Sequence, residues 1–286
     1  MATLRDLKRR IRSVQSTRQI TKAMEMVAAA KLRKAQVRAH QARPFAAGMV
    51  QVLAAFAAAP EAQAHPLFQA RPVRRRGLIV IAAERGLCGA YNSTLLRAAD
   101  QYLHEAGVPV GFHLVGRKAI DYMTRRKREI DERYTDLPAQ ADFATARTVA
   151  HDAVRSFLSG RVDAVDLLYT HFISTLNRNV VVEPFLPISS EAAAGPGAAR
   201  TRDFILEPDV QTIFEHLLPR YAHTRLFLAL AEAYASEQSA RMVAMGAANN
   251  NAGEMIDSLT LLRNRLRQAA ITREIAEIVG GAEALA

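Results

Sequence analysis

Both ends of the chain carry the spacing of apolar residues that is typical of long helices. From Thr3 to Arg43 there is neither Gly nor Pro, and strong helix formers dominate. Apolar residues follow a three-four spacing in two runs, with a change of phase between Val14 and Ile20. The runs are Leu4, Leu7, Ile11 and Val14, then Ile20, Met24 and Val27.

The C-terminal end continues the same pattern over a longer stretch. Residues 220–279 contain no Pro, and they predict one helix far longer than is usual in a globular domain. The seam positions of this helix are Tyr234, Gln238, Arg241, Met245, Ala248, Ala252, Met255, Leu259, Leu262, Leu266 and Ala269, and the seam then moves to Ile271, Ile275 and Ile278. Because each helix needs a partner for its stripe, we expect the two chain ends to form an antiparallel coiled coil.

The middle of the chain alternates short apolar runs with helical patterns. The strands predicted from these runs are Leu78–Ile81, Val108–Val115, Glu129–Tyr134, Val162–Ile173 and Asn179–Ile188. Such alternation favours a mainly parallel sheet flanked by helices, with an antiparallel edge. The predicted fold class is therefore α/β, with a long antiparallel coiled coil of the N- and C-terminal helices and an inserted Rossmann-like α/β domain. The expected limits are 1–60 with 208–286 for the coiled coil, 75–190 for the α/β domain, and 191–207 for a loop and foot segment.

Composition narrows the class of protein. Residues 1–43 contain twelve Lys or Arg but only Asp6 and Glu25 as acids, so this segment carries a net +10, equal to that of the whole chain. A basic helix indicates an acidic partner, an anionic surface or a nucleic acid, or else simply a solvated face. Cys88 is the only cysteine, which excludes an internal disulfide. The longest apolar run, Phe45–Ala59, is shorter than the ~20 residues of a bilayer span, so we expect membrane association only through partners.

Candidate chemical sites are sparse. The loop Glu84–Asn92 follows a strand and opens a helix, as phosphate-binding loops do, but it matches neither glycine-rich phosphate motif, and a structural turn is the favoured interpretation. Cys88 has no assignable base and is interpreted as a small buried residue. His216 and His223 lack the further ligands of a metal site. The sequence therefore predicts no cofactor, no metal and no catalytic residue.

Two polar residues interrupt the C-terminal seam. Gln238 and Arg241 occupy positions where an apolar side chain would stabilise the fold by about 1.5–3 kcal/mol. An unpaired buried charge costs several kcal/mol, so either the coiled coil opens at this level or Arg241 meets an acidic acceptor. An acceptor on a partner is the favoured interpretation.

Five blocks of sequence carry a family resemblance. They are Ile20–Leu32, Arg85–Asn92, Ser236–Met245, Asn264–Ile275 and Glu277–Ala282. These blocks closely resemble those of the gamma subunit of F-type ATP synthases, and they are distributed over the whole chain. The family commonly has Ser-Asp before the block at Arg85, where this chain has Ala83-Glu84, and the cysteine-containing insert of chloroplast members is missing.

The resemblance implies a non-catalytic rotor shaft that couples ion flow to ATP synthesis and hydrolysis. Its partners would be the alpha and beta subunits of the catalytic head, the epsilon subunit and the membrane c-ring, with the chain peripheral to the cytoplasmic face of a bacterial inner membrane. The contacts with the head implied by the matching motifs are Met24, Arg241, Gln268, Thr272 and Glu274. The contacts with the ring would be Phe204, Glu207 and Asp209.

Two alternatives remain open from the residues themselves. A basic coiled-coil protein that binds nucleic acid would explain the charge, although the basic residues interleave with the apolar stripe and few aromatics are available for stacking. A nucleotide-using α/β enzyme would explain the middle of the chain, although it lacks any acid, base or phosphate motif.

Overall fold

The computed structural model describes residues 3–56, 65–138, 141–188 and 210–283. In chain order its elements are α1 (Leu4–Phe56), β1 (Arg76–Ile81), α3 (Tyr91–Glu105), β2 (Val110–Val115), α4 (Arg117–Arg125), β3 (Ile130–Tyr134), α5 (Phe143–Leu158), β4 (Ala164–Phe172), β5 (Arg178–Leu186) and α7 (Val210–Glu283). They form two compact units, Met1–Ala28 with Met242–Ala286, and Ala29–Arg241. We call the first of these the end unit and the second the central unit. The predicted domain limits at residues 60 and 208 fall outside the described residues and stay a prediction.

The central unit contains a five-stranded sheet in the order β3-β2-β1-β4-β5. β1 pairs in parallel with both β2 and β4, β2 pairs in parallel with β3, and β5 is antiparallel to β4. β2 is buried along its whole length, and β1 along all but its first residue, as expected of strands that are covered on both faces. The predicted parallel sheet with an antiparallel edge is confirmed.

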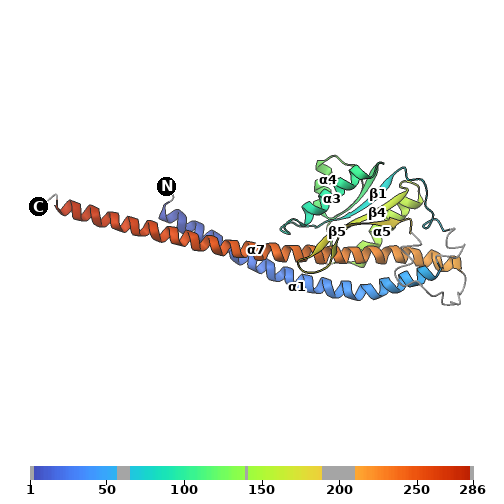
Figure 1. Cartoon of the computed structure of the whole chain (residues 1–286), viewed down its shortest axis with the longest axis horizontal. Coiled ribbons are helices and arrows are strands. Elements are labelled where there is room, and N and C mark those ends of the chain that lie inside the picture. The colour runs from blue at the N-terminus through green and yellow to red at the C-terminus, as the bar shows by residue number, and fades with distance from the viewer. Residues whose placement is uncertain (1–2, 57–64, 139–140, 189–209, 284–286) are drawn as a thin grey trace. The chain divides into compact units, whose positions relative to one another are not determined.

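Helices cover both faces of this sheet (Figure 1). Leu78 and Val80 of β1 pack with α3 and α4 on one face, whereas Ile79 and Ile81 pack with α5 and α7 on the other. The core on the face covered by α5 and α7 also contains Met49 and Leu53 of α1, so both chain-end helices contribute to it. The period of two along β1 thus assigns alternate side chains to two separate cores.

α1 extends further than the sequence pattern suggests. Gly and Pro are absent up to Arg43, yet the helix continues through Pro44 to Phe56. A proline inside a helix costs about 3 kcal/mol. Burial of Met49 and Leu53 in the core offsets that cost, since each buried side chain stabilises by roughly 1.5–3 kcal/mol.

In the end unit α1 and α7 pair in antiparallel fashion. Glycines seven residues apart on α7 face charged residues seven apart on α1. A Cβ atom placed on Gly246 would lie 3.6 Å from the carboxylate carbon of Glu25, and one on Gly253 would lie 3.5 Å from the guanidinium carbon of Arg18. The residue numbers of the facing pairs fall along α1 as they rise along α7, so the two helices run in opposite directions. The predicted antiparallel coiled coil is therefore confirmed in this unit.

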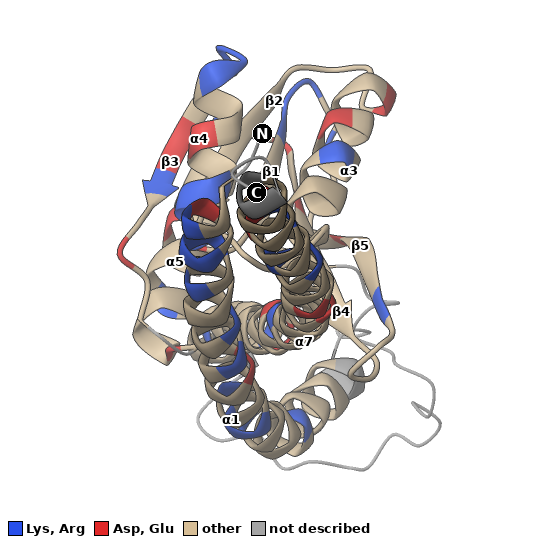
Figure 2. Ribbon diagram, turned by 90° about the vertical axis from the view of Figure 1, so that its left-hand side faces the viewer, with Lys and Arg blue, Asp and Glu red and all other residues tan. Residues whose placement is uncertain are grey.

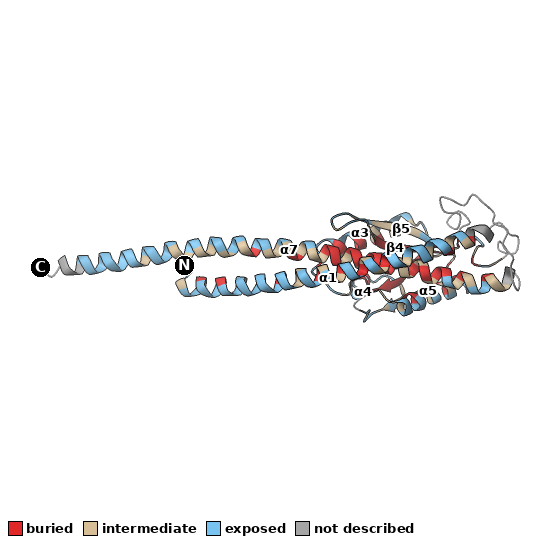
Figure 3. Cartoon of the chain, turned by 90° about the horizontal axis from the view of Figure 1, so that it is seen from below, coloured by how far each residue is buried: buried red, intermediate tan, exposed pale blue. Residues whose placement is uncertain are grey.

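The predicted change of phase in the α1 seam is wrong. Ile20 and Val27 are 57% and 54% exposed, whereas Thr21 and Ala28 are buried. The buried positions Leu7, Ile11, Thr21, Ala28 and Leu32 follow one uninterrupted three-four spacing once Val14, Arg18 and Glu25 are included. Figure 3 shows that buried positions on α1 and α7 are concentrated in the central unit and that most positions of the end unit are exposed.

Candidate functional site

The strand order gives the sheet a topological switch point at the carboxyl ends of β1 and β4. The chain leaves β1 toward β2 on one side, and β4 lies on the other side, so the connections diverge between these two strands. In open α/β sheets this is the point where ligands usually bind. Here the segment of α7 from Ala233 to Arg241 contacts the residues that follow both strands.

Hydrogen bonds hold α7 at this switch point. The Tyr91 hydroxyl at the start of α3 donates to the Ala233 carbonyl at 3.1 Å. The Ser236 hydroxyl donates to the Thr170 carbonyl of β4 at 3.1 Å, and the Ser239 hydroxyl donates to the carbonyl of Thr175 in the turn after β4. Ser236 and Ser239 are completely buried, so each bond satisfies a hydroxyl that water cannot reach.

The loop after β1 is held by its own side chains. The Asn92 amide oxygen accepts from the Ala83 amide at 3.1 Å, and the Asn92 amide nitrogen donates to Cys88 Sγ at 3.1 Å. Leu87 and Gly89 have positive φ values of 61° and 58°, which produce the sharp turn. The predicted structural turn is therefore confirmed.

Glu84 occupies the helix end that could otherwise hold an anion. Its carboxylate accepts from the Arg117 amide at the first residue of α4 at 3.0 Å and lies 3.4 Å from the Arg117 guanidinium. Gly116, the residue before α4, offers no side chain to cap the helix. Glu84 thus provides the negative charge that a helix N-terminus favours.

Arg241 is paired within the chain. Its guanidinium lies 2.6 Å from the Glu237 carboxylate one turn earlier, and the two side chains are 12% and 13% exposed. It also donates to the carbonyls of Arg85 and Gly86, at 3.3 and 3.2 Å. The acidic acceptor that we expected on a partner is therefore supplied by the same helix, and Arg241 joins α7 to the β1 loop.

Burial sets the protonation of this cluster. It raises the pKa of Glu237, and the Arg241 charge opposes the rise. It also raises the pKa values of the Cys88 thiol and the Tyr91 hydroxyl, so both groups are neutral near pH 7. A neutral buried thiol is a poor nucleophile. The predicted interpretation of Cys88 as a small buried residue is confirmed, since it packs with Ala83, Tyr91 and Ala240.

A second buried acid joins three elements of the central unit. Glu232 of α7 is 4% exposed. Its carboxylate lies 2.6 Å from His171 Nδ1 of β4 and 3.4 Å from the Arg43 guanidinium of α1. The antiparallel pairing of the chain-end helices thus continues into the central unit, with a polar contact in place of an apolar one.

The remaining predicted contact residues belong to the end unit or lie outside the described residues. Gln268, Thr272 and Glu274 are exposed on α7, and Met24 is half-buried on α1. Phe204, Glu207 and Asp209 lie outside the described residues. Among the described residues no group of three or more His, Cys, Asp or Glu is arranged to hold a metal ion. No helix of the described ranges is both long and apolar enough to cross a membrane.

The sequence patterns did not identify the residues that hold α7 at the switch point. Ser236 and Ser239 belong to the block Ser236–Met245. The only sequence signal for a close contact there is that small and hydroxyl residues are frequent in this part of the helix. Glu237 could have been found, because it stands four residues before Arg241 on a helix.

Positive charge follows α1. Figure 2 shows Lys and Arg positions recurring along this helix. Within the described residues, the only acid partners of these cations are Asp6 for Arg9, Glu25 for Lys22 and Glu232 for Arg43.

The ATP synthase family model matches residues 3–285 of this chain. The chain is 47% identical over 285 residues to the ATP synthase gamma chain of Moorella thermoacetica, with all of both chains covered. This chain belongs to the ATP synthase gamma chain family. The gamma chain of Heliobacterium modesticaldum is 44% identical over 290 residues, again with full coverage of both.

Solved structures agree with this family. A chain in the central stalk and c-ring structure of the Tetrahymena thermophila mitochondrial ATP synthase has a TM-score of 0.65 and 26% identity, covering 80% of this chain and 99% of that one. A chain in a Euglena gracilis mitochondrial ATP synthase structure has a TM-score of 0.71 at 20% identity, covering 99% and 94%, which supports the fold. The predicted family and fold class are confirmed. The nucleic-acid-binding alternative finds no support in these comparisons.

Proposed function

We propose that this gamma chain is the central rotor shaft of an F-type ATP synthase and regulates its ATPase activity and proton flow. Membership of the gamma chain family over the full length of the chain carries this proposal. The antiparallel pair of long helices suits a shaft, because supercoiled helices resist bending. One asymmetric shaft presents a different surface to each of three equivalent catalytic subunits, and its rotation takes each of them through binding, synthesis and release of ATP.

The proposed partners are the alpha and beta subunits of the head, the epsilon subunit and the membrane c-ring. The chain itself is proposed to be non-catalytic, and it would be held at the cytoplasmic face of a bacterial inner membrane through these partners. The basic side chains of α1 support a head with acidic loops, since complementary charge guides association and sets specificity.

Purification of the tagged chain from native membranes tests this function. We expect a stoichiometric ATPase head to accompany it, with ATP hydrolysis that is lost when the chain is removed. Recovery of the chain alone, or with nucleic acid in place of an ATPase, would contradict the proposal.

We also propose Met24, Arg241, Gln268, Thr272 and Glu274 as contacts with the head. Exposure of Gln268, Thr272 and Glu274 supports this assignment, since their side chains cover no core of this chain. Replacing these three by Ala should lower steady-state ATP turnover without changing the helix content of the chain. Turnover equal to wild type would remove them from the interface.

The ring contact is proposed at Phe204, Glu207 and Asp209. Carboxylates near the start of a helix also favour its positive end, and α7 begins at Val210. Changing Glu207 and Asp209 together to Lys should weaken retention of the head on membranes as the salt concentration rises. Ala at both positions is the matched control for charge reversal. Unchanged retention together with unchanged proton-driven synthesis would exclude this contact.

A further inference from the structure

His113 of β2 is a buried titratable side chain without a hydrogen bond. It is 0% exposed, and within the described residues neither nitrogen of its ring has a partner. Its register partner on β1 is Ile79, so the imidazole lies on the face of the sheet that α5 and α7 cover. Buried polar groups are nearly always hydrogen-bonded, and the proposed shaft function does not account for this exception.

The two acids nearest in effect to His113 are bonded to other groups. Asp131 of β3 has one carboxylate oxygen 2.8 Å from the Arg75 guanidinium, and its other oxygen is buried and makes no bond to the imidazole. Asp152 of α5 accepts from the Tyr134 hydroxyl at 2.9 Å. In this arrangement no carboxylate is placed to pair with a charge on His113.

The remaining charged groups around the ring do not compensate a charge either. Glu132, opposite His113 in the β2–β3 register, lies 3.9 Å from the Arg155 guanidinium. Burial lowers the pKa of His113, the two acids oppose this, and Arg161 and Arg75 lower the pKa further. The imidazole is therefore neutral at pH 7, and a proton added to it would be a buried charge, which is costly without a partner.

β3 is the least firmly held of the elements around His113. It pairs only with β2, and none of its residues is fully buried. The pairing is also interrupted beside the imidazole, because Phe112 pairs with Ile130 and His113 pairs with Glu132, which leaves Asp131 as an extra residue. β1, by contrast, pairs with a strand on each side.

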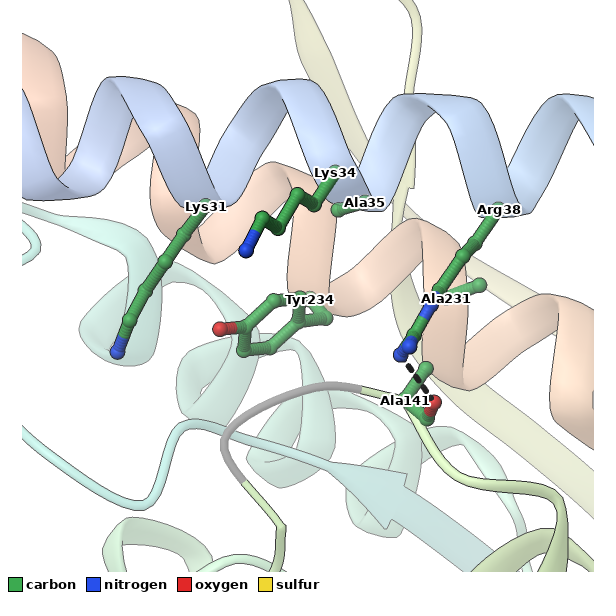
Figure 4. Close-up of a pocket in the computed structure, with 7 residues that line it drawn as sticks. All are labelled: Lys31, Lys34, Ala35, Arg38, Ala141, Ala231 and Tyr234. Carbon is green, nitrogen blue, oxygen red and sulfur yellow. Dashed lines mark hydrogen bonds between the residues drawn. The ribbon is translucent and has the colours of Figure 1, made fainter.

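α5 covers the same face of the sheet and is held at several points. The core contains five of its side chains, those of Ala146, Val149, Ala150, Ala153 and Phe157. Asp142 caps the helix by accepting from the Thr145 amide at 3.2 Å. Just before this cap, Arg38 of α1 donates to the Ala141 carbonyl at 3.3 Å (Figure 4). Water can therefore reach His113 more easily by separation of β3 than by movement of α5.

We propose that His113 is a proton switch that releases the edge strand β3 from the sheet under acidic conditions. Protonation places a cation in a dry space with no free acid beside it, and opening is easiest where the fewest buried contacts are lost. The Tyr134 carbonyl at the end of β3 accepts from the Gly116 amide before α4, so release of β3 would also loosen the start of α4. Such a switch goes beyond the proposed shaft function, because it makes the central unit respond to pH.

Amide hydrogen exchange of the full-length chain at pH 7 and pH 5.5 tests the proposal. Because the released strand takes up one proton, its opening constant rises by up to tenfold per pH unit below 6.5. After correction for the intrinsic rate, we expect exchange across Ile130–Tyr134 to be about fivefold to tenfold faster at the lower pH. Exchange across Arg76–Ile81 of β1 should stay unchanged.

Variants assign the effect to one side chain. His113→Leu should abolish the acceleration, since an apolar side chain of similar size needs no hydrogen bond. His113→Gln cannot take up a proton either and should give the same result, so the test does not depend on the folding of a single variant. His151→Gln is the matched control, because His151 is an exposed histidine of α5 and its loss should leave the acceleration in place.

Three results would overturn the proposal. They are equal exchange of β3 at the two pH values in the wild type, an acceleration that persists in both His113 variants, and a parallel acceleration in β1, which would mean that acid unfolds the whole central unit. None of these measurements requires the assembled synthase, so they are independent of the proposed shaft function.

Discussion

Replacing Arg241 by Ala removes the cation that neutralises a buried carboxylate. Glu237 keeps one contact, from the Gln238 side-chain amide at 3.2 Å, but it loses its charge partner at 2.6 Å. Removing one member of a buried pair typically costs 3–5 kcal/mol. Because Glu237 can take up a proton, we expect the lower end, a loss of about 3 kcal/mol in the free energy of unfolding at neutral pH.

The second variant needed is Arg241→Ala combined with Glu237→Gln. Since the amide carries no charge, we expect the double variant to recover most of the loss and to remain about 1 kcal/mol below wild type, the value of the lost bonds to the β1 loop. Arg85→Ala is the matched control. Its carbonyl, which accepts from Arg241, stays in place while its exposed side chain is removed, so the change should be within about 0.5 kcal/mol.

Urea unfolding followed by far-ultraviolet circular dichroism measures these differences, and amide hydrogen exchange over residues 84–92 locates them. The loss should also depend on pH. A carboxyl whose pKa is raised on folding contributes stability that is complete below its unfolded value near 4.5 and is lost as pH rises through the folded pKa. Arg241→Ala raises that pKa further, so its cost should be larger at pH 8 than at pH 5.

Two results would refute this reasoning. A loss below about 0.5 kcal/mol for Arg241→Ala would mean that the pair contributes no more than an exposed one. Failure of Glu237→Gln to recover stability would mean that the uncompensated carboxylate is not the cause.

Three further predictions concern other parts of the chain. Gly246→Ala should stabilise it by about 0.5–1 kcal/mol in urea unfolding, because a Cβ there meets Glu25 only at ordinary contact distance and Gly is a poor helix former, whereas Gly246→Leu should destabilise it. Burial lowers the pKa of His113 below 6.5, so the free energy of unfolding that depends on neutral His113 is present above pH 6.5 and is lost as pH falls through the folded pKa. His113→Leu should therefore make the unfolding midpoint less sensitive to acid in that window, and an unchanged pH profile would contradict this. Cys88 should react with iodoacetamide near pH 7 only after unfolding, and mild dithiol reduction should leave ATPase activity unchanged; rapid labelling of the native chain would show that the thiol is accessible.

Sequence patterns predicted the strands well because the sheet is covered on both faces. The run Leu78–Ile81 is apolar throughout, and the structure extends it only to Arg76. The strand order could not be obtained in this way, since strands buried on both faces carry no signal that identifies their neighbours. The strand order is known only from the structure, in which β1 pairs in parallel with both β2 and β4.

The seam of α1 was misread because it is not made of large apolar residues alone. Thr21 and Ala28 are buried in it, and Glu25 lies against a glycine, whereas the more hydrophobic Ile20 and Val27 are exposed. Counting hydrophobic residues therefore selected a neighbouring face. Those exposed apolar side chains are available to a partner, which a pattern within one chain cannot distinguish from a core.

The acceptors of Arg241 illustrate a different limit. Glu237 is one helical turn away and could be inferred from spacing, but the Arg85 carbonyl stands 156 positions earlier in the chain. A backbone carbonyl has no sequence signature, so only the fold could reveal this contact.

The position of α7 against the sheet has a mechanical consequence. Ala233, Ser236 and Ser239 are held from the same side of the helix by α3, β4 and the turn that follows it, while Arg241 is tied to the loop after β1. Rotation of this part of α7 about the helix axis would break hydrogen bonds to several elements at once. Torsional strain in α7 therefore cannot accumulate between Ala233 and Arg241. The stretch before Ala233 is held as well, because Glu232 is bound to His171 of β4 and to Arg43 of α1. Elastic twist in α7 would therefore concentrate after Arg241, where the helix belongs to the end unit and most of its positions are exposed.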